Sequence, residues 1–216
     1  MQITQHQRFE LNLSASERFF ACRRYEPLGH APEFALPMWH RSIIPRMING
    51  AWTMNSYSRP VDGSSVDFRA AEGHSFVELQ LNEDEALVFN YRKLLGFSGG
   101  IRLHTTVSLS LATMSMNRLL FNLASGPGRI VFEVTGVPEL HLDAVKSKSF
   151  APSRLIAWSA DSEFEIEVRT GTLDYYMSSV YLKPVATKGL VIDADEQSKS
   201  APNFMLEILR KVYSPF

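Results

Sequence analysis

The sequence predicts a mainly β protein whose antiparallel strands form a sandwich or a barrel-like fold. Three observations support this prediction. Apolar and polar residues alternate along the middle of the chain, short strand-like segments recur between turns, and the clearest helical spacing of apolar residues lies near the C-terminus. Short strands separated by turns at this spacing are typical of all-β domains.

The central stretch from Ile101 to Val134 shows the alternation most clearly. One side of it carries Ile101, Leu103, Thr105, Val107, Leu109 and Leu111, and the other side carries Arg102, His104, Thr106, Ser108 and Ser110. Side chains of a strand point alternately to opposite faces, so we expect one face on a core and one in water. Met114 to Ala124 also fits a short helix. We favour a strand over Leu119 to Ala124, because a turn and another strand pattern follow it.

The turn in this stretch is Ser125-Gly126-Pro127-Gly128. Gly126 and Gly128 tolerate positive φ and Pro127 fixes its own φ, so the segment is predicted to connect neighbouring strands. We single out Gly126, Pro127 and Gly128 as a structural turn for this reason. A phosphate-binding loop would need more glycines, a following helix and usually a lysine, which the sequence does not have here.

The N-terminal part is less regular. Arg8 to Leu13 alternates like a short strand, whereas Arg18 to Tyr25 fits either a helical turn or a strand. Prolines recur from Glu26 to Gly63 and exclude long regular elements there, yet the same segment is rich in tryptophan, isoleucine and methionine. We expect an irregular segment that packs on the body of the protein or contacts another subunit.

From Ser75 onward the sequence predicts a succession of short strands. A first strand, with Val77, Leu79 and Leu81 on one face, ends at a polar turn, Asn82 to Glu85. A second strand runs from Ala86 to Tyr91, and Gly96 to Gly100 is expected to turn the chain into the central stretch. Later strands are expected at Leu140 and Leu142, Leu155 to Trp158, Glu163 to Val168, Ser179 to Leu182, and Leu190 to Ile192.

Two further patterns concern the second half of the chain. Pro202 to Val212 has apolar residues at helical spacing, so a C-terminal amphipathic α-helix is predicted, with Pro202 in its first turn. The spacing from Leu87 to Phe97 equals that from Leu140 to Phe150, with basic residues between them in both cases. A duplicated β unit stacked on itself would explain this weak repeat.

Composition and charge fit an ordinary globular domain. The chain has 216 residues, 45% of them hydrophobic and 21% charged, and a formal net charge of −1. Such a chain can bury a core and has no basic field that would attract nucleic acid. The single cysteine, Cys22, cannot form an intrachain disulfide and is expected to be a small buried residue. The N-terminus lacks the features of a secretory signal, so we expect a cytoplasmic protein.

Three segments together resemble a known family. They are Val77 to Glu85, Leu119 to Phe132 with its Gly-Pro-Gly step, and Glu139 to Asp143 followed by Phe150-Ala151. They are similar to the family named for altered inheritance of mitochondria, member twenty-four, and its bacterial relatives. The resemblance covers about Ser75 to Asp195. Ser115-Met116-Asn117 stands where the family usually has Gly-Glu-Gly.

The resemblance implies a fold and an organisation. The family is grouped with the tryptophan RNA-binding attenuation protein (TRAP-like), a short variant of the double-stranded β-helix. This implies stacked antiparallel β-sandwich units and homo-oligomers, with no catalytic residues to carry over. We therefore divide the chain into residues 1–74, a divergent N-terminal β segment with a Pro-rich irregular region; residues 75–195, TRAP-like β-sandwich units; and residues 196–216, the C-terminal helix.

The sequence shows no catalytic or metal-binding motif. Cupins, which are enzymatic double-stranded β-helices, need a His-x-His pair, a nearby Glu and a later His, and the six histidines here include no such pair. His104 and His141 are expected to be solvated or singly hydrogen-bonded. Glu163, Glu165 and Glu167 share one face of a strand and are expected to be a solvated face rather than a cation site. We expect no cofactor.

Taken together, these observations favour a non-enzymatic, oligomeric β scaffold or binding module. The alternative is a cupin-like small-molecule-binding protein or enzyme. A homo-oligomer and a protein partner fit the apolar Pro-rich segment. The balanced charges argue against nucleic acid, and the C-terminal helix is expected to pack on protein rather than on a membrane surface.

Overall fold

The computed structural model shows a chain made of short antiparallel strands. It describes residues 2–6, 8–13, 17–22, 25, 27, 33–35, 54–58, 66–107, 120–141, 149–168, 180–186 and 190–192. The mainly β, antiparallel class predicted from the sequence is confirmed within these residues. The predicted C-terminal helix, residues 196–216, lies outside them.

The described strands fall into three consecutive units whose matching strands follow the same order, with one strand more in unit 2 than in the other two. The strand β1 (Gln2–His6) precedes them. Unit 1 holds β2 (Arg8–Leu11), β3 (Arg18–Cys22), β4 (Glu33–Ala35), β5 (Met54–Ser58) and β6 (Val66–Arg69). Unit 2 holds β7 (His74–Leu81), β8 (Ala86–Phe89), the 3-10 turn η2 (Tyr91–Lys93), β9 (Leu94–Ser98), β10 (Arg102–Val107), β11 (Leu120–Ser125) and β12 (Gly128–Thr135). Unit 3 holds β13 (Glu139–His141), the 3-10 turn η3 (Pro152–Arg154), β14 (Leu155–Ser159), β15 (Glu163–Val168), β16 (Val180–Ala186) and β17 (Leu190–Ile192).

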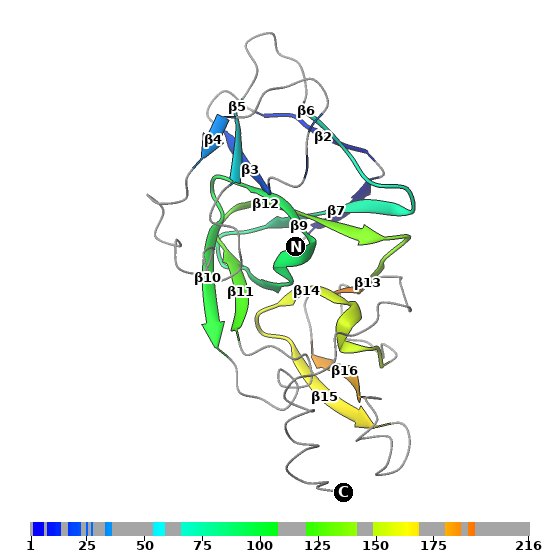
Figure 1. The fold of residues 1–216 in the computed structure, drawn as a ribbon. Helices are drawn as coiled ribbons and strands as arrows, with labels where there is room; N and C mark the ends of the chain where they lie inside the picture. The colour runs from blue at the N-terminus through cyan, green and yellow to red at the C-terminus, as the bar shows by residue number, and fades with distance from the viewer. Residues whose placement is uncertain are drawn as a thin grey trace, which may run out of the picture.

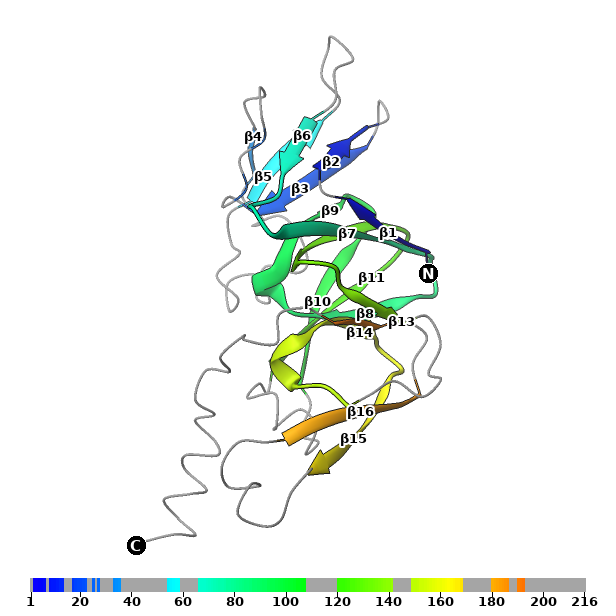
Figure 2. The ribbon, with the colours of Figure 1, turned by 90° about the vertical axis from the view of Figure 1, so that its right-hand side faces the viewer.

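Neighbouring units share their sheets. We number the sheets along the stack seen in Figures 1 and 2: sheet 1 is β2-β6, sheet 2 is β1-β7-β12-β9-β3-β5-β4, sheet 3 is β13-β17-β14-β8-β11-β10, and sheet 4 is β15-β16. Sheet 2 joins strands of units 1 and 2, and sheet 3 joins strands of units 2 and 3. Apart from β1, the two large sheets match strand for strand. In sheet 4, the place that β8 holds next to β11 in sheet 3 is taken by the single residue Phe150, which forms an isolated β-bridge to Leu182 of β16.

The residue registers support this match. Gly96 of β9 lies opposite Ala21 of β3, and Ala157 of β14 lies opposite Phe89 of β8. Both are contacts between units. The β9–β12 and β14–β17 ladders also carry a register irregularity at corresponding places. An irregularity retained at one position of a ladder is a feature of the fold rather than an accident.

Backbone hydrogen bonds repeat at the same two boundaries. The Gly99 N–H donates to the Arg18 carbonyl at 2.7 Å, and the Ala160 N–H donates to the Ala86 carbonyl at 2.8 Å. Each bond ties the turn after β9 or β14 to the first residue of the neighbouring unit's strand. Successive units are therefore held together by sheet hydrogen bonds as well as by apolar contacts.

Apolar side chains fill the space between each pair of sheets. The cluster between sheets 2 and 3 includes Leu79, Phe89, Phe97 and Phe132, with the Phe89 and Phe132 ring centroids 5.6 Å apart. The cluster between sheets 1 and 2 includes Phe9, Phe19, Phe68 and Phe76. The cluster between sheets 3 and 4 includes Phe121, Phe150, Trp158 and Leu182. Sheets 2 and 3 are thus covered on both faces by core.

Most of the predicted strands are confirmed. Ile101 and Leu103 are buried while Arg102 and His104 are exposed, as the alternation predicts. Arg18 to Cys22, left open between helix and strand, is the strand β3. The Pro-rich segment holds the short strands β4 and β5 within its described part. Residues 108–119, which include the rest of the long predicted strand, lie outside the described residues.

Three expectations need correction. Gly96 is in the middle of strand β9, and the turn is confined to Gly99-Gly100. The Gly126-Pro127-Gly128 turn joins β11 of sheet 3 to β12 of sheet 2, so the two strands are not neighbours in one sheet. The repeat matches Leu94 with Leu155 rather than Leu87 with Leu140, because β8 and β13 hold different places in sheet 3.

Candidate functional site

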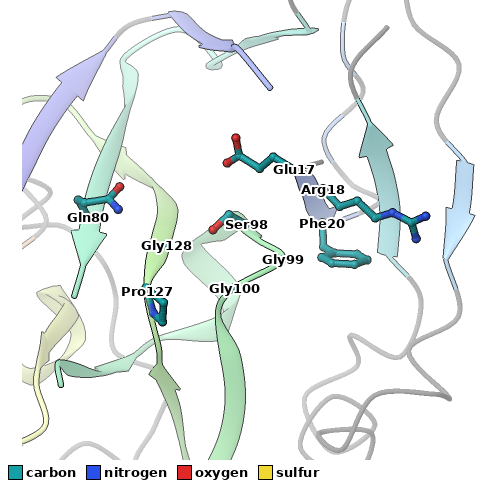
Figure 3. Close-up of a pocket in the computed structure, with 9 residues that line it drawn as sticks. All are labelled: Glu17, Arg18, Phe20, Gln80, Ser98, Gly99, Gly100, Pro127 and Gly128. Carbon is teal, nitrogen blue, oxygen red and sulfur yellow. The ribbon is translucent and has the colours of Figure 1, made fainter. Parts of the chain in front are cut away.

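A shallow depression of about 590 Å³ lies where units 1 and 2 meet. It is lined by Glu17, Arg18, Phe20, Gln80, Ser98, Gly99, Gly100, Pro127 and Gly128. Figure 3 shows that Glu17 and Ser98 project between the Pro127 turn and β3, whereas the Arg18 side chain points away from them. Its residues come from four separate parts of the chain, and it includes Pro127 and Gly128 of the turn singled out from the sequence.

The floor of the depression is made by two turns in backbone contact. A Cβ on Gly100 would overlap the Pro127 carbonyl oxygen, and a Cβ on Gly126 would lie 2.8 Å from the Gly100 carbonyl oxygen. Gly126 also has φ of +100°, which residues with a Cβ rarely adopt. These glycines are therefore required by the close approach of the turns, and the structure gives the Gly126-Pro127-Gly128 turn a packing role.

Arg129 anchors one wall of the depression. Its guanidinium donates to the Asn12 carbonyl at 2.7 Å and to a Glu17 carboxylate oxygen at 3.0 Å, and it lies 3.9 Å from the Glu78 carboxylate. Its backbone N–H donates to Ser98 Oγ at 3.0 Å. The Arg129 side chain is only 17% exposed, so these contacts hold unit 1 against unit 2 in a partly dry environment.

A second polar cluster at the same boundary was not visible from the sequence. Glu133 on β12 accepts a hydrogen bond from the Tyr25 hydroxyl at 2.6 Å, and its other carboxylate oxygen lies 2.9 Å from His74 Nδ1. The side chains of His74 and Glu133 are 35% and 19% exposed. The carboxylate can orient the imidazole through Nδ1–H. Tyr25 and Glu133 lie 108 residues apart in the chain, so no local pattern could have revealed the cluster.

The other residues considered from the sequence are scattered. Cys22 is buried, as expected, with its Sγ 3.0 Å from the Tyr91 hydroxyl oxygen. His104 is exposed on β10, and His141 lies in β13. Glu163, Glu165 and Glu167 are exposed on β15, with Lys183 opposite Glu165, which confirms the solvated face. Within the described residues, no three His, Cys, Asp or Glu side chains are grouped so that they could hold a metal ion.

The depression is open and combines the ring of Phe20 with the polar side chains of Gln80, Ser98 and Glu17, the last of which accepts a hydrogen bond from Arg129 next to it. None of the helices in the described part of the chain has the length and apolar character that crossing a bilayer requires.

Comparison with known proteins gives a family and a fold. The family model described as "Mitochondrial biogenesis AIM24" matches residues 38–189. The chain is similar to the crystal structure of protein SPYM3_0169 from Streptococcus pyogenes, with a TM-score of 0.56 and 12% sequence identity, covering 98% of this chain and 99% of that one. At this identity the likeness shows the fold alone. No curated protein matches the chain.

Proposed function

This chain belongs to the AIM24 family, and from its structure we propose that it is a non-enzymatic β scaffold or binding module that works as a homo-oligomer. The observation that carries this proposal is the filled interior of the stack. Phe89, Phe97 and Phe132 occupy the space between sheets 2 and 3, and each is 1% exposed or less. A cupin-like enzyme would hold its ligand in that space. Recognition is therefore proposed to occur on the outside of the stack.

The edge of sheet 3 supports self-association. In the described part of the chain β13 pairs only with β17, whereas β7, at the matching place in sheet 2, pairs with β1 as well. A strand edge offers backbone groups to which another strand can add. Val137, in the turn before β13, is a large apolar residue with 74% exposure. The edge and this side chain together form a surface suited to a second copy.

Sedimentation velocity at several micromolar concentrations tests the proposal. The wild-type chain of 24.4 kDa is expected to show a mass that rises with concentration toward a multiple of that value. Val137→Glu should weaken the association, because it places a charge in the proposed contact. Val185→Glu, at an apolar residue of β16 with 46% exposure, serves as the matched control and should associate like the wild type. A strict monomer that also retains no protein partner in a pull-down would contradict the proposal.

A second candidate function rests on the depression between units 1 and 2. Its combination of an aromatic ring, amide and hydroxyl groups fits a small molecule, as the cupin-like alternative requires. A thermal-shift screen of small metabolites would detect such a ligand. Gln80→Ala should abolish a shift produced by binding there, because Gln80 is an exposed wall residue whose loss leaves the core intact.

We place the protein in the cytoplasm as part of the same proposal. Its only cysteine, Cys22, is buried and can form no intrachain disulfide, which fits a compartment where thiols stay reduced. Fractionation of cells followed by detection with an antibody to the chain tests this. Recovery in the soluble cytosolic fraction is expected, and recovery in a membrane pellet that salt does not release would contradict it.

A further inference from the structure

The two end sheets of the stack, β2-β6 and β15-β16, match only part of the inner sheets, and their outer faces differ from those of the inner sheets. In sheet 1, Phe9 lies opposite Phe68, as Val77 lies opposite Phe132 in sheet 2. All four side chains point into the cluster on the inner side of their own unit. Phe9 precedes Phe19 by as many residues as Val77 precedes Leu87, and Phe19 and Leu87 hold matching places in sheets 2 and 3. Each residue of β2 and β6 can therefore be matched to one of β7 and β12.

At the unit 1 end, a charged pair stands where unit 2 has an apolar pair. By the register just given, Arg8 matches Phe76 and Asp67 matches Val131. Phe76 and Val131 are fully buried in the cluster between sheets 1 and 2, which unit 1 covers. Arg8 is 59% exposed and its guanidinium bonds the Asp67 carboxylate.

At the unit 3 end, the same change occurs on β16. Glu165 lies opposite Lys183 in sheet 4, as His104 lies opposite Leu123 in sheet 3. Leu123 packs on the cluster between sheets 3 and 4, which unit 3 covers. Lys183, at the matching place, is exposed. A polar side chain thus replaces an apolar one at the outer face of both end sheets.

We infer that these outer faces are caps that end the stack at three units and prevent a further copy of the chain from adding to either end. The sheet-sharing contact between units is heterologous, so a chain with uncapped ends could repeat it without closing and would grow into fibres. Stacked repeats need polar outer faces on their terminal repeats to stay soluble. Burying Arg8, Asp67 or Lys183 under another unit would remove their charges from water, which opposes such growth.

Replacing the charged residues of the end sheets by the apolar residues found at the matching places in unit 2 should therefore allow chains to associate end to end. One variant, Arg8→Phe with Asp67→Val, carries the unit 2 residues at the unit 1 end, and another, Lys183→Leu, carries the unit 2 residue at the unit 3 end. When the two variants are mixed in equal amounts, sedimentation velocity should show a one-to-one complex. Its affinity should be at least tenfold higher than that of any end-to-end contact between either variant and the wild type. A mixture that sediments as its separate components overturns the inference.

Two controls distinguish specific pairing of matched ends from nonspecific hydrophobic association. Glu163→Leu also places a leucine on the exposed face of sheet 4. The residue that matches Glu163 in unit 2 is the exposed Arg102, so this position is polar in both units. It should not pair with the Arg8→Phe, Asp67→Val chain, and equal pairing by Glu163→Leu overturns the inference. If the double variant does not fold, as judged by circular dichroism, Arg8→Phe alone is used with the same expected and contrary results. The surface proposed for self-association, at Val137 and the edge of sheet 3, is not part of either end sheet. A failure of that self-association would therefore not change the result expected for the end-to-end complex.

Discussion

Gly96→Ala is the change that most directly probes the joint between units 1 and 2. Gly96 lies in β9 with Ala21 of β3 opposite it. A Cβ there would overlap the Phe20 carbonyl oxygen and lie 2.5 Å from Cε1 of Phe19, a residue with no exposed surface. Neither the backbone of a central strand nor a fully buried ring can move freely. We therefore expect Gly96→Ala to lower the free energy of unfolding by about 3 kcal/mol, the upper end of the range for overpacked cores.

That cost can be measured by urea and thermal unfolding. For a chain of this size about 3 kcal/mol corresponds to a Tm lower by roughly 6–12 °C. Gly99→Ala is the matched control in the same segment, because its nearest contact would be 3.4 Å from the Arg18 carbonyl oxygen. The control should be neutral or stabilise by up to about 1 kcal/mol through the unfolded state. A Gly96→Ala protein within 0.5 kcal/mol of the wild type would refute the reasoning, since β9 could not then lie against β3 as described.

Three more predictions concern the polar contacts. Arg129→Met should destabilise the protein by about 1.5 kcal/mol in urea unfolding, because a partly buried, multiply bonded cation is lost; an unchanged midpoint would contradict this. Tyr25→Phe removes the hydroxyl that donates to Glu133 and should cost about 1 kcal/mol, whereas no loss would show that the contact does not form in solution. Burial alone would raise the pKa of Glu85, but hydrogen bonds, including one from the Asn82 N–H at 2.8 Å, hold that pKa below its usual value. The ionised Glu85 therefore stabilises the fold above the unfolded-state pKa, and this stability is lost as the pH falls through the lower folded-state pKa. Glu85→Gln should reduce the loss of stability between neutral and acid pH by about 0.5 kcal/mol, a small effect because the carboxylate is only partly buried; an identical pH profile would contradict the assignment.

Alternation predicted those strands that have one wet face. At the start of β10, Leu103 and the preceding Ile101 face the core while Arg102 and His104 face water, so the sequence shows the period of two. The same holds for β15, whose predicted limits, Glu163 to Val168, agree with the structure. The Gly126-Pro127-Gly128 turn was also predictable because turn chemistry is local.

Strands buried on both faces could not be predicted in this way. In β9, Leu94 and Phe97 face the cluster between sheets 2 and 3, and Leu95 faces the cluster between sheets 1 and 2. Both faces are apolar, so no alternation remains, and the sequence alone suggests that Gly96 belongs to a turn. A glycine inside a strand can instead mark a close approach of another backbone, which is its role here.

Contacts between units cannot be predicted from the sequence for a different reason. The pairing of β3 with β9 brings together segments about 75 residues apart, and one chain without its relatives gives no signal for such a pair. The same limit applies to Tyr25, His74 and Glu133, which meet only because β7 and β12 lie side by side next to unit 1. The repeat is visible in the sequence, but its correct alignment follows only from the order of strands in the sheets.

Each of the two large sheets is formed by strands of two successive units. Nuclear Overhauser effects between Hα atoms test it directly, because residues directly opposite each other in antiparallel strands bring these atoms close when they are a non-hydrogen-bonded pair. Strong cross-peaks are expected between Phe19 and Ser98 and between Leu87 and Ser159, which lie opposite each other across the two boundaries. Absence of both, with cross-peaks joining β3 or β8 only to strands of its own unit, would contradict the account.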